Sequence, residues 1–288
     1  MEFVFKQNRV GCEKSNVKAV FVAKNLCGLA TTDEIGIATH DGIWKYFESH
    51  THNDPLAAFV DDSATCLILS YDDSSDAYLI ASEEPTLPSS GPSFTVQFQT
   101  TLNTKITAAD GELLGTADGR VLRWSVSEDK LEIKDLVTFD SEIVQINVRK
   151  SLALASTRTL AKVFAILDSS NQYQVGSRPR KNTSHGGALL SKKAFAARPN
   201  CKIFVYDLSE HVVTSTLSLK DSVSSSRYSL IDNSVTKVPE ENMISVPELG
   251  QLHFLSEPEE KIVVSFSQEC IYAIDVTLPA VLRVYDVR

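Results

Sequence analysis

The amino-acid sequence predicts an all-β protein whose antiparallel sheets repeat along the chain, and three observations support this fold class. Short alternating apolar segments occur in pairs around polar turns, which is the pattern of β-hairpins. These turns recur about every 40 residues, as in repeat architectures. No long apolar stripe with the 3.6-residue period of a helix interrupts them. The chain has 288 residues, of which 43% are hydrophobic, so a substantial core is expected.

Two hairpins carry an Asp-Gly dipeptide between alternating strands. Asp41-Gly42 divides the segment 35–47, and Asp118-Gly119 divides the segment 113–126. Asp-Gly favours a type I′ turn, because both central residues of that turn need a positive φ. We therefore expect a tight hairpin at each site, and these two hairpins are the clearest of the series.

Six segments share the hairpin pattern and set the period of the fold. They lie near residues 35–47, 66–81, 113–126, 152–167, 194–208 and 262–276. The turn centres are separated by about 33, 44, 40 and 41 residues, and then by about 69, whereas a four-stranded propeller blade repeats about every 40–45 residues. The spacing predicts a WD40-like β-propeller in a single domain, 1–288, with each hairpin as the two middle strands of a blade. A generic antiparallel sandwich is the alternative.

Residues outside the hairpins fit the same period. Tyr206-Asp207 ends a strand much as the Trp-Asp pair ends a WD repeat, and 212–217 would then supply the outer strand of that blade. The segment 143–148 alternates and is expected to form an innermost strand. Pro199-Asn200 provides the turn of the fifth hairpin, and 17–24 is interpreted as a strand.

Two further features concern packing and loops. Trp44 and Trp124 follow the two Asp-Gly turns, and we expect both to pack inside blades rather than to form exposed binding spots. The serine-rich segment 221–250 is predicted to be a surface loop, which would explain the long last interval. A degenerate blade within that segment is the alternative.

Composition limits the partners and the compartment. The formal net charge of −9 argues against nucleic acid as the main partner, since phosphate binding needs clustered Lys and Arg. It also argues against more than peripheral or indirect association with anionic membranes. The five cysteines are scattered without a CxxC pair, which indicates reduced thiols in a cytosolic protein.

No residue set predicts catalysis, a cofactor or a metal ion. His50 and His52 lack a third ligand of the kind that zinc sites use. The aspartates at 61, 62, 72, 73 and 76 lack the spacing of a calcium loop. Ser184-His185-Gly186-Gly187 has no partner nucleophile elbow, and the two glycines are interpreted as a tight bend. We therefore expect a protein that is not an enzyme.

One basic concentration could bind an acidic partner or a phosphoinositide headgroup. It comprises Arg178, Arg180 and Lys181. A solvated loop is the alternative interpretation, and the paired-arginine motif FRRG of phosphoinositide-binding propellers does not occur in the chain.

The middle and end of the chain resemble a known family. The segments Ser184–Leu190, Ala196–Asn200 and Ile203–Asp207 are similar, in order and spacing, to the N-terminal WD-repeat-like propeller of the Hermansky–Pudlak syndrome 5 family. The likeness covers roughly 113–282 and extends to related tectonin-repeat autophagy proteins. Asn200 replaces the usual Gly, which Asn can do because it tolerates positive φ, and Tyr206 stands near the usual Trp.

The resemblance implies a role and partners. That family supplies a subunit of the biogenesis of lysosome-related organelles complex 2, so the chain is expected to be a non-catalytic scaffold for vesicle trafficking. Its partners would be the other subunits, and it would lie in the cytosol and on endosomal membranes through them. The family has about seven blades, whereas six are recognisable here, so a short form or an incomplete ring is expected. A propeller adaptor in autophagy or another pathway and an enzyme that uses the propeller channel are the alternatives.

Overall fold

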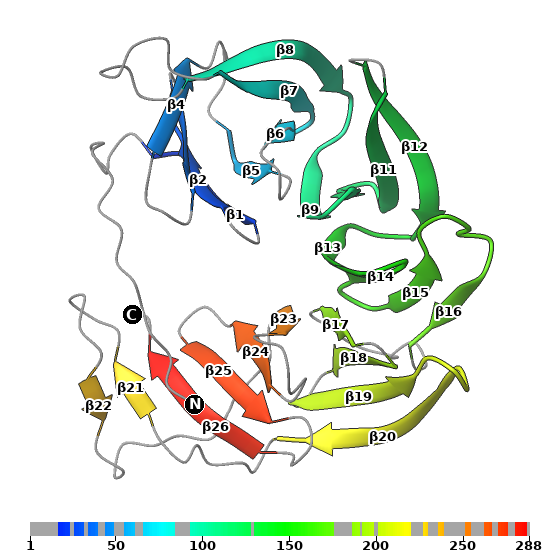
Figure 1. Ribbon diagram of the computed structural model, residues 1–288. Helices are drawn as coiled ribbons and strands as arrows, with labels where there is room; N and C mark the ends of the chain where they lie inside the picture. The colour runs from blue at the N-terminus through cyan, green and yellow to red at the C-terminus, as the bar shows by residue number, and fades with distance from the viewer. Residues whose placement is uncertain are drawn as a thin grey trace. The chain divides into compact units, whose positions relative to one another are not determined.

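The computed structural model describes a chain of β-strands and connecting turns. It describes residues 17–23, 26–31, 34–39, 44–48, 55–60, 66–83, 93–127, 130–175, 186–190, 192–198, 201–219, 227–229, 236–238, 251–254, 262–266, 270–275 and 280–286. All regular elements among these residues are strands (Figure 1). The described residues accordingly include no helix that could span a bilayer. The predicted all-β fold is confirmed.

The chain divides into two compact units. The first comprises Met1–Asp118 and Leu122–Asp135, and the second comprises Gly119–Val121 and Leu136–Arg288. The division falls within the third sheet of the chain, so that the start of β11 and the end of β12 belong to the second unit.

The first unit is built from four-stranded sheets in which neighbours along the chain are also neighbours in the sheet. Their strands are β1 (Ala19–Ala23), β2 (Leu26–Ala30), β3 (Glu34–Thr39) and β4 (Trp44–Glu48); β5 (Ala57–Val60), β6 (Cys66–Ser70), β7 (Ser75–Glu83) and β8 (Ser93–Leu102); and β9 (Ile106–Asp110), β10 (Leu113–Thr116), β11 (Arg120–Ser127) and β12 (Lys130–Thr138). The first strand of the second sheet, β5, contacts both β1 and β9, so consecutive sheets meet through their first strands.

Buried side chains join consecutive sheets of the first unit. Ile35 of the first sheet packs in one cluster with Leu67 and Leu69 of the second. Ile68 of the second sheet packs in another cluster with Ile106 and Leu122 of the third. Strand β6 can contribute to both clusters because all five of its residues are buried and successive side chains point to opposite faces.

Two buried serines extend this connection through hydrogen bonds. The backbone N–H of Ile106 donates to Ser70 Oγ and to Ser75 Oγ, each at 3.0 Å. The hydroxyl of Ser75 lies 2.9 Å from the carbonyl oxygen of Thr104, to which it can donate. The first strand of the third sheet is thereby bound to the middle strands of the second.

The second unit contains two four-stranded antiparallel sheets and one six-stranded sheet among its described residues. Their strands are β13 (Ile143–Arg149), β14 (Leu152–Thr157), β15 (Ala161–Ala165) and β16 (Gln172–Gln174); β17 (Gly187–Leu189), β18 (Lys193–Arg198), β19 (Lys202–Asp207) and β20 (Val212–Ser218); and β21 (Arg227–Ser229), β22 (Thr236–Val238), β23 (Gln251–Phe254), β24 (Ile262–Phe266), β25 (Cys270–Asp275) and β26 (Ala280–Asp286). In the last sheet, β21 pairs with β26 in parallel and with β22 in antiparallel orientation.

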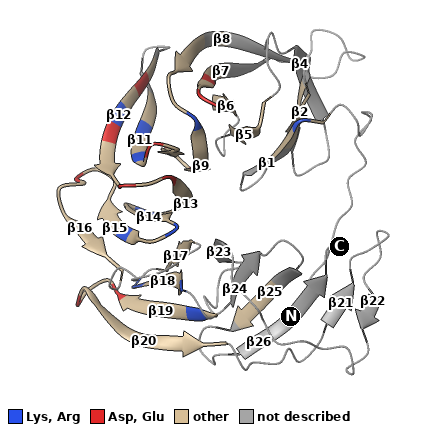
Figure 2. Ribbon diagram, turned by 180° about the vertical axis from the view of Figure 1, so that it is seen from behind, with Lys and Arg blue, Asp and Glu red and all other residues tan. Residues whose placement is uncertain are grey.

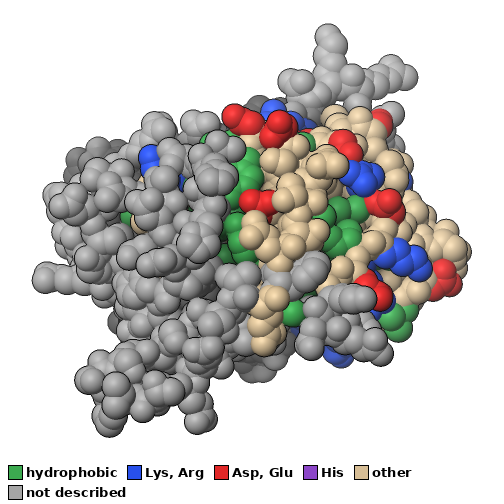
Figure 3. All heavy atoms as spheres, turned by 90° about the horizontal axis from the view of Figure 1, so that it is seen from above, with side chains coloured by type: hydrophobic (Ala, Val, Ile, Leu, Met, Phe, Trp, Pro, Cys, Tyr) green, Lys and Arg blue, Asp and Glu red, His purple; other side chains and the backbone are tan. Residues whose placement is uncertain are grey.

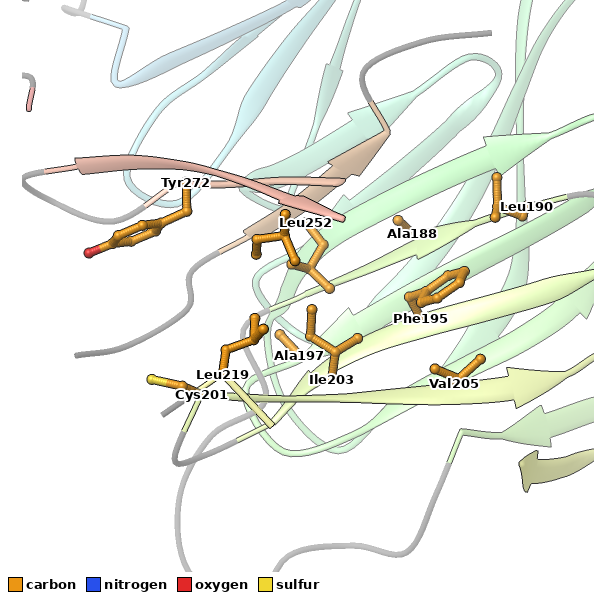
Figure 4. Packing of buried hydrophobic residues seen from close by; sticks show 11 residues of the cluster. Ala188, Leu190, Phe195, Ala197, Cys201, Ile203, Val205, Leu219, Leu252 and Tyr272 are labelled. Carbon is orange, nitrogen blue, oxygen red and sulfur yellow. The ribbon is translucent and has the colours of Figure 1, made fainter. Parts of the chain in front are cut away.

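Apolar clusters again join consecutive sheets of this unit. Phe195 and Ile203 from the sheet β17–β20 pack together with Leu252 of β23, and Figure 4 shows these side chains in one group. A separate cluster brings Leu154 and Val163 of the sheet β13–β16 against Tyr206 of β19. The sheet β17–β20 therefore has a buried cluster on each face.

A single side-chain amide connects three sheets of the second unit. Gln145 of β13 is only 3% exposed. Its Oε1 accepts from the N–H of Gly187 at 3.0 Å and from the N–H of Leu252 at 3.3 Å, and its Nε2 donates to the carbonyl oxygen of Leu252 at 2.6 Å. The backbone of β17 and that of β23 are thus both bound to β13.

Two details differ from the sequence-based expectations. The first predicted hairpin forms the last two strands of its sheet rather than the middle two, because β2 also pairs with β3. The segment 221–250, most of which is predicted to be a loop, contains β21 and β22; β21 pairs with β26, and β22 pairs with β21.

Candidate interaction surface

The Asp118-Gly119 turn has a different geometry from the one predicted. Only Gly119 has a positive φ, of 87°, so the turn is not of type I′. The carboxylate of Asp118 accepts a hydrogen bond from the hydroxyl of Thr116 and another, at 3.3 Å, from that of Thr104. The backbone at Gly119 packs closely against that of Phe139, because a Cβ on Gly119 would lie 2.7 Å from the carbonyl oxygen of Phe139. These contacts give the turn an architectural role.

Trp124 is buried and packs among apolar residues of the first unit, including Ile68 and Ile106. Its indole Nε1 has no hydrogen-bond acceptor in the part of the chain that the structure describes. Trp44 begins β4, and its side chain lies outside the described residues. Trp124 is therefore a core residue and offers no exposed binding spot.

The Tyr206-Asp207 pair ends β19 and leads into the turn before β20, the last strand of the sheet. Tyr206 is buried beside Tyr173, and this burial raises the pKa of its hydroxyl. The carboxylate of Asp207 accepts hydrogen bonds from the hydroxyl of Ser209 at 2.5 Å, from its N–H at 2.8 Å and from the N–H of Glu210 at 3.1 Å. These bonds, with that of the Ser209 hydroxyl the strongest, lower the pKa of Asp207. The pair anchors a side-chain-capped turn between β19 and β20.

A stacked pair of rings fixes the last residue of that turn. The rings of His211 and Tyr173 lie parallel within 7°, with their centroids 3.5 Å apart. His211 has a φ of 57°, a left-handed conformation that is uncommon for residues other than Gly. Because Tyr173 belongs to β16, the stack joins the last strand of the sheet β13–β16 to the turn before β20, the last strand of the sheet β17–β20.

Strand β20 is an exposed and uncharged sheet edge. It is the last strand of its sheet, and six of its seven residues are exposed. Val212–Ser218 contains no charged residue, Pro or Gly. Figure 2 shows β20 without blue or red, whereas β12 carries bands of both colours. Natural proteins commonly protect sheet edges with charges, so an uncharged edge leaves its backbone polar groups available for pairing with another chain.

The backbone of β20 leaves polar groups at this edge. The N–H of Leu219 donates to the carbonyl oxygen of Cys201 on the neighbouring strand at 2.8 Å. Since alternate residues of an antiparallel strand bond to the same neighbour, the N–H and C=O groups of Ser218 and Thr216 point the other way. A bulge occurs at Thr214, whose hydroxyl donates to the carbonyl oxygen of Val205 at 3.3 Å. The straight part of the edge is therefore Ser215–Ser218.

The outer strand β8 also contains no charged residue, whereas other exposed surfaces differ from the edge of β20. Acidic and basic side chains are interspersed over the described part of the face drawn in Figure 3. Strand β16 ends its sheet with only three residues, and β12 ends its sheet with four charged ones. Among the described residues, no three His, Cys, Asp or Glu side chains gather as metal ligands would.

Several predicted residues lie outside the described part of the chain. They are Asp41, Gly42, Arg178, Arg180, Lys181, Pro199 and Asn200, together with His50, His52, Asp61 and Asp62. At the predicted bend, Gly186 has a φ of 120°, and a Cβ on Gly187 would lie 2.5 Å from Leu154 Cδ2.

Sequence reasoning missed Gln145 and His211. Gln145 stands in an alternating strand, where a polar residue is expected to face solvent. A polar residue in an otherwise apolar innermost strand is the signal that could have identified it. No protein-family model and no curated protein matches this chain.

Proposed function

We propose that this chain is a non-catalytic scaffold that binds other proteins, and that the exposed, uncharged edge of β20 is one of its docking surfaces. The observation that carries the proposal is that six of the seven residues of β20 are exposed and none of the seven is charged, whereas the outer strand β12 has four charged residues and β16 has only three residues in all. An extended segment of a partner could add a strand to such an edge through main-chain hydrogen bonds.

We further propose that the six sheets are blades of a WD40-like β-propeller. Five sheets have four strands that follow one another in chain order, as blades do. Within each unit the first strands of consecutive sheets are in contact, β5 with β1 and β9, and β17 with β13 and β23. The sixth sheet has the four strands β23–β26 extended by β21 and β22.

The cellular role follows from the resemblance of residues 113–282 to the Hermansky–Pudlak syndrome 5 family. The proposed role is that of a subunit in vesicle transport to lysosome-related organelles, located in the cytosol and brought to endosomal membranes by its partners. The segments that carry the resemblance form the consecutive strands β17–β20, and this arrangement supports the proposal.

Affinity capture from cells tests both parts of the proposal. The wild-type chain, Thr216→Lys on β20 and Gln97→Lys on β8 would be expressed with the same tag. Gln97 is also exposed on the outermost strand of a sheet, so it is a matched control. We expect the wild type and Gln97→Lys to capture other subunits of the organelle-biogenesis complex, and Thr216→Lys to capture several-fold less.

Three outcomes would contradict the proposal. Equal capture by Thr216→Lys would remove β20 as the docking surface. Enrichment of autophagy or coat proteins in place of organelle-biogenesis subunits would support the alternative propeller adaptor, and no enriched subunit of either kind would reject the trafficking role.

A further inference from the structure

We propose that a surface hollow beside Lys162 binds a carboxylate group carried by an extended segment of a partner protein. The hollow belongs to the second unit and has a volume of about 400 Å³. It is lined by Thr138, Phe139, Asp140, Leu160, Lys162 and Gln174. This volume falls within the range of roughly 300–1,000 Å³ that is common for binding pockets. The inference rests on the proposed role as a protein-binding scaffold and adds the chemistry of a partner.

The ammonium group of Lys162 is held in place at this hollow. Its Nζ donates to the carbonyl oxygen of Thr138 at 3.3 Å and to Oε1 of Gln172 at 3.1 Å. It also lies 4.8 Å from the centroid of the Phe139 ring, a cation–π distance. An ammonium group has three N–H donors, so these two hydrogen bonds leave one donor for a ligand.

The charge of Lys162 has no counter-ion within the described residues. Both hydrogen-bond partners are neutral, and no described carboxylate lies within ion-pair distance of Nζ. Partial burial lowers the pKa of Lys162, which shows that its surroundings disfavour the charge. A carboxylate placed in the hollow would compensate that charge, and this complementarity selects an anion as the ligand.

The wall of the hollow favours a peptide over a free acid. Phe139 and Leu160 are largely buried but still line the hollow. A single ion pair at a water-exposed site contributes little binding free energy. A ligand must therefore add apolar contacts on Phe139 and Leu160, as an acidic residue with an aliphatic neighbour in a peptide would.

The charge of the hollow favours a carboxylate over a phosphate group. Asp140 lines the same hollow and is exposed, and its negative charge would oppose a second negative charge on the ligand. A monoanion can approach Lys162 with less of this repulsion than a dianion. The predicted recognition element is thus one Asp or Glu side chain, or a chain-terminal carboxylate.

Backbone amide chemical shifts of the full chain provide a direct test. The probes would be acetate, inorganic phosphate, and two blocked tripeptides, Leu-Glu-Leu and Leu-Gln-Leu. We expect the Glu peptide to shift the amide signals of Thr138, Phe139 and Lys162, and to bind more tightly than acetate. The Gln peptide should bind about two- to fivefold more weakly, the change expected for an exposed ion pair.

Variants of Lys162 separate charge recognition from folding. Lys162→Met keeps the aliphatic stem and should abolish the preference for Glu over Gln, whereas Lys162→Arg should keep it even if the Met variant folds poorly. Lys192→Met, at an exposed lysine outside the hollow, is the matched control and should behave as the wild type. Equal binding of the two peptides, absence of peptide binding, or tighter binding of phosphate would overturn the proposal. These binding measurements use purified protein and are independent of the cellular capture. The hollow can fail to bind the peptide while the capture succeeds, and the capture can fail while the hollow binds the peptide.

Discussion

The side-chain amide of Gln145 binds both backbone polar groups of Leu252, a residue 107 positions further along the chain. The same amide oxygen accepts from the N–H of Gly187. One buried side chain of β13 therefore supplies hydrogen bonds to the backbones of two other strands. Buried backbone groups that lose a partner are costly, because they have given up their hydrogen bonds to water.

Replacement of Gln145 by Leu should strongly destabilise the protein. The N–H groups of Gly187 and Leu252 and the carbonyl of Leu252 would lose their partner, and each unsatisfied group costs about 1–3 kcal/mol. We expect the free energy of unfolding in urea to fall by about 3 kcal/mol or more. Gln97→Leu, at an exposed position of β8, should change it by less than about 0.5 kcal/mol. Similar values for the two variants would show that the Gln145 bonds contribute little.

Gly119→Ala should be more destabilising than Gly111→Ala. Both glycines have positive φ, 87° and 55°, so both substitutions carry the left-handed penalty of about 1–2 kcal/mol. Only Gly119 faces backbone carbonyl oxygens, at 2.7 and 2.8 Å from a Cβ, whereas Gly111 is exposed. Thermal melting of the two variants would measure the difference, and equal melting temperatures would contradict the close approach at Gly119.

The Asp207 turn predicts a stability contribution that depends on pH. Its pKa is lower in the folded protein than the ordinary value of about 3.9. The contribution to stability is therefore present above about pH 4 and is lost as the pH falls through the lowered pKa that Asp207 has in the folded protein. The difference in urea midpoint between wild type and Asp207→Asn should be largest near neutral pH and should shrink in acid.

Ser209→Ala is the companion variant for this prediction. It removes the hydroxyl that contributes most to the lowered pKa of Asp207. The pH dependence attributed to Asp207 should become weaker in this background. An unchanged pH dependence would show that another group is responsible for it.

His211 should tolerate Asn better than Val. Asn adopts the left-handed conformation that His211 has, whereas a β-branched residue is strained there. Both variants lose the ring stack with Tyr173, so their difference isolates the backbone effect. We expect Val to lower the free energy of unfolding by about 1 kcal/mol more than Asn. Equal stabilities would indicate that the turn rearranges.

Local patterns predicted the strands well, because each strand pair is close in sequence. The pairs β10–β11, β14–β15 and β18–β19 lie within the predicted hairpins, and β1 lies within the segment interpreted as a strand. Strand β2 was missed, because Leu26–Ala30 lacks a polar alternation and contains a Gly. Strands β21 and β22 could not be predicted from their own residues, since β21 depends on β26, more than fifty residues later.

The candidate surface was only partly predictable. The outer strand at 212–217 and the Tyr206-Asp207 pair were identified from their resemblance to a repeat end, and the structure places them next to each other. The hollow at Lys162 could not be foreseen, because it combines the end of β12 with β15 and β16. Side chains that meet across strands distant in sequence leave no local pattern.

The contrast in burial between β14 and β20 has a consequence for the evolution of this chain. Five of the six residues of β14 are buried, so replacements there should be purged in every lineage. The exposed residues of β20 are under no such packing constraint, and in a strand that met only water they would drift and acquire Lys or Glu. A set of orthologues in which β20 never acquires charge would therefore record selection by a bound partner.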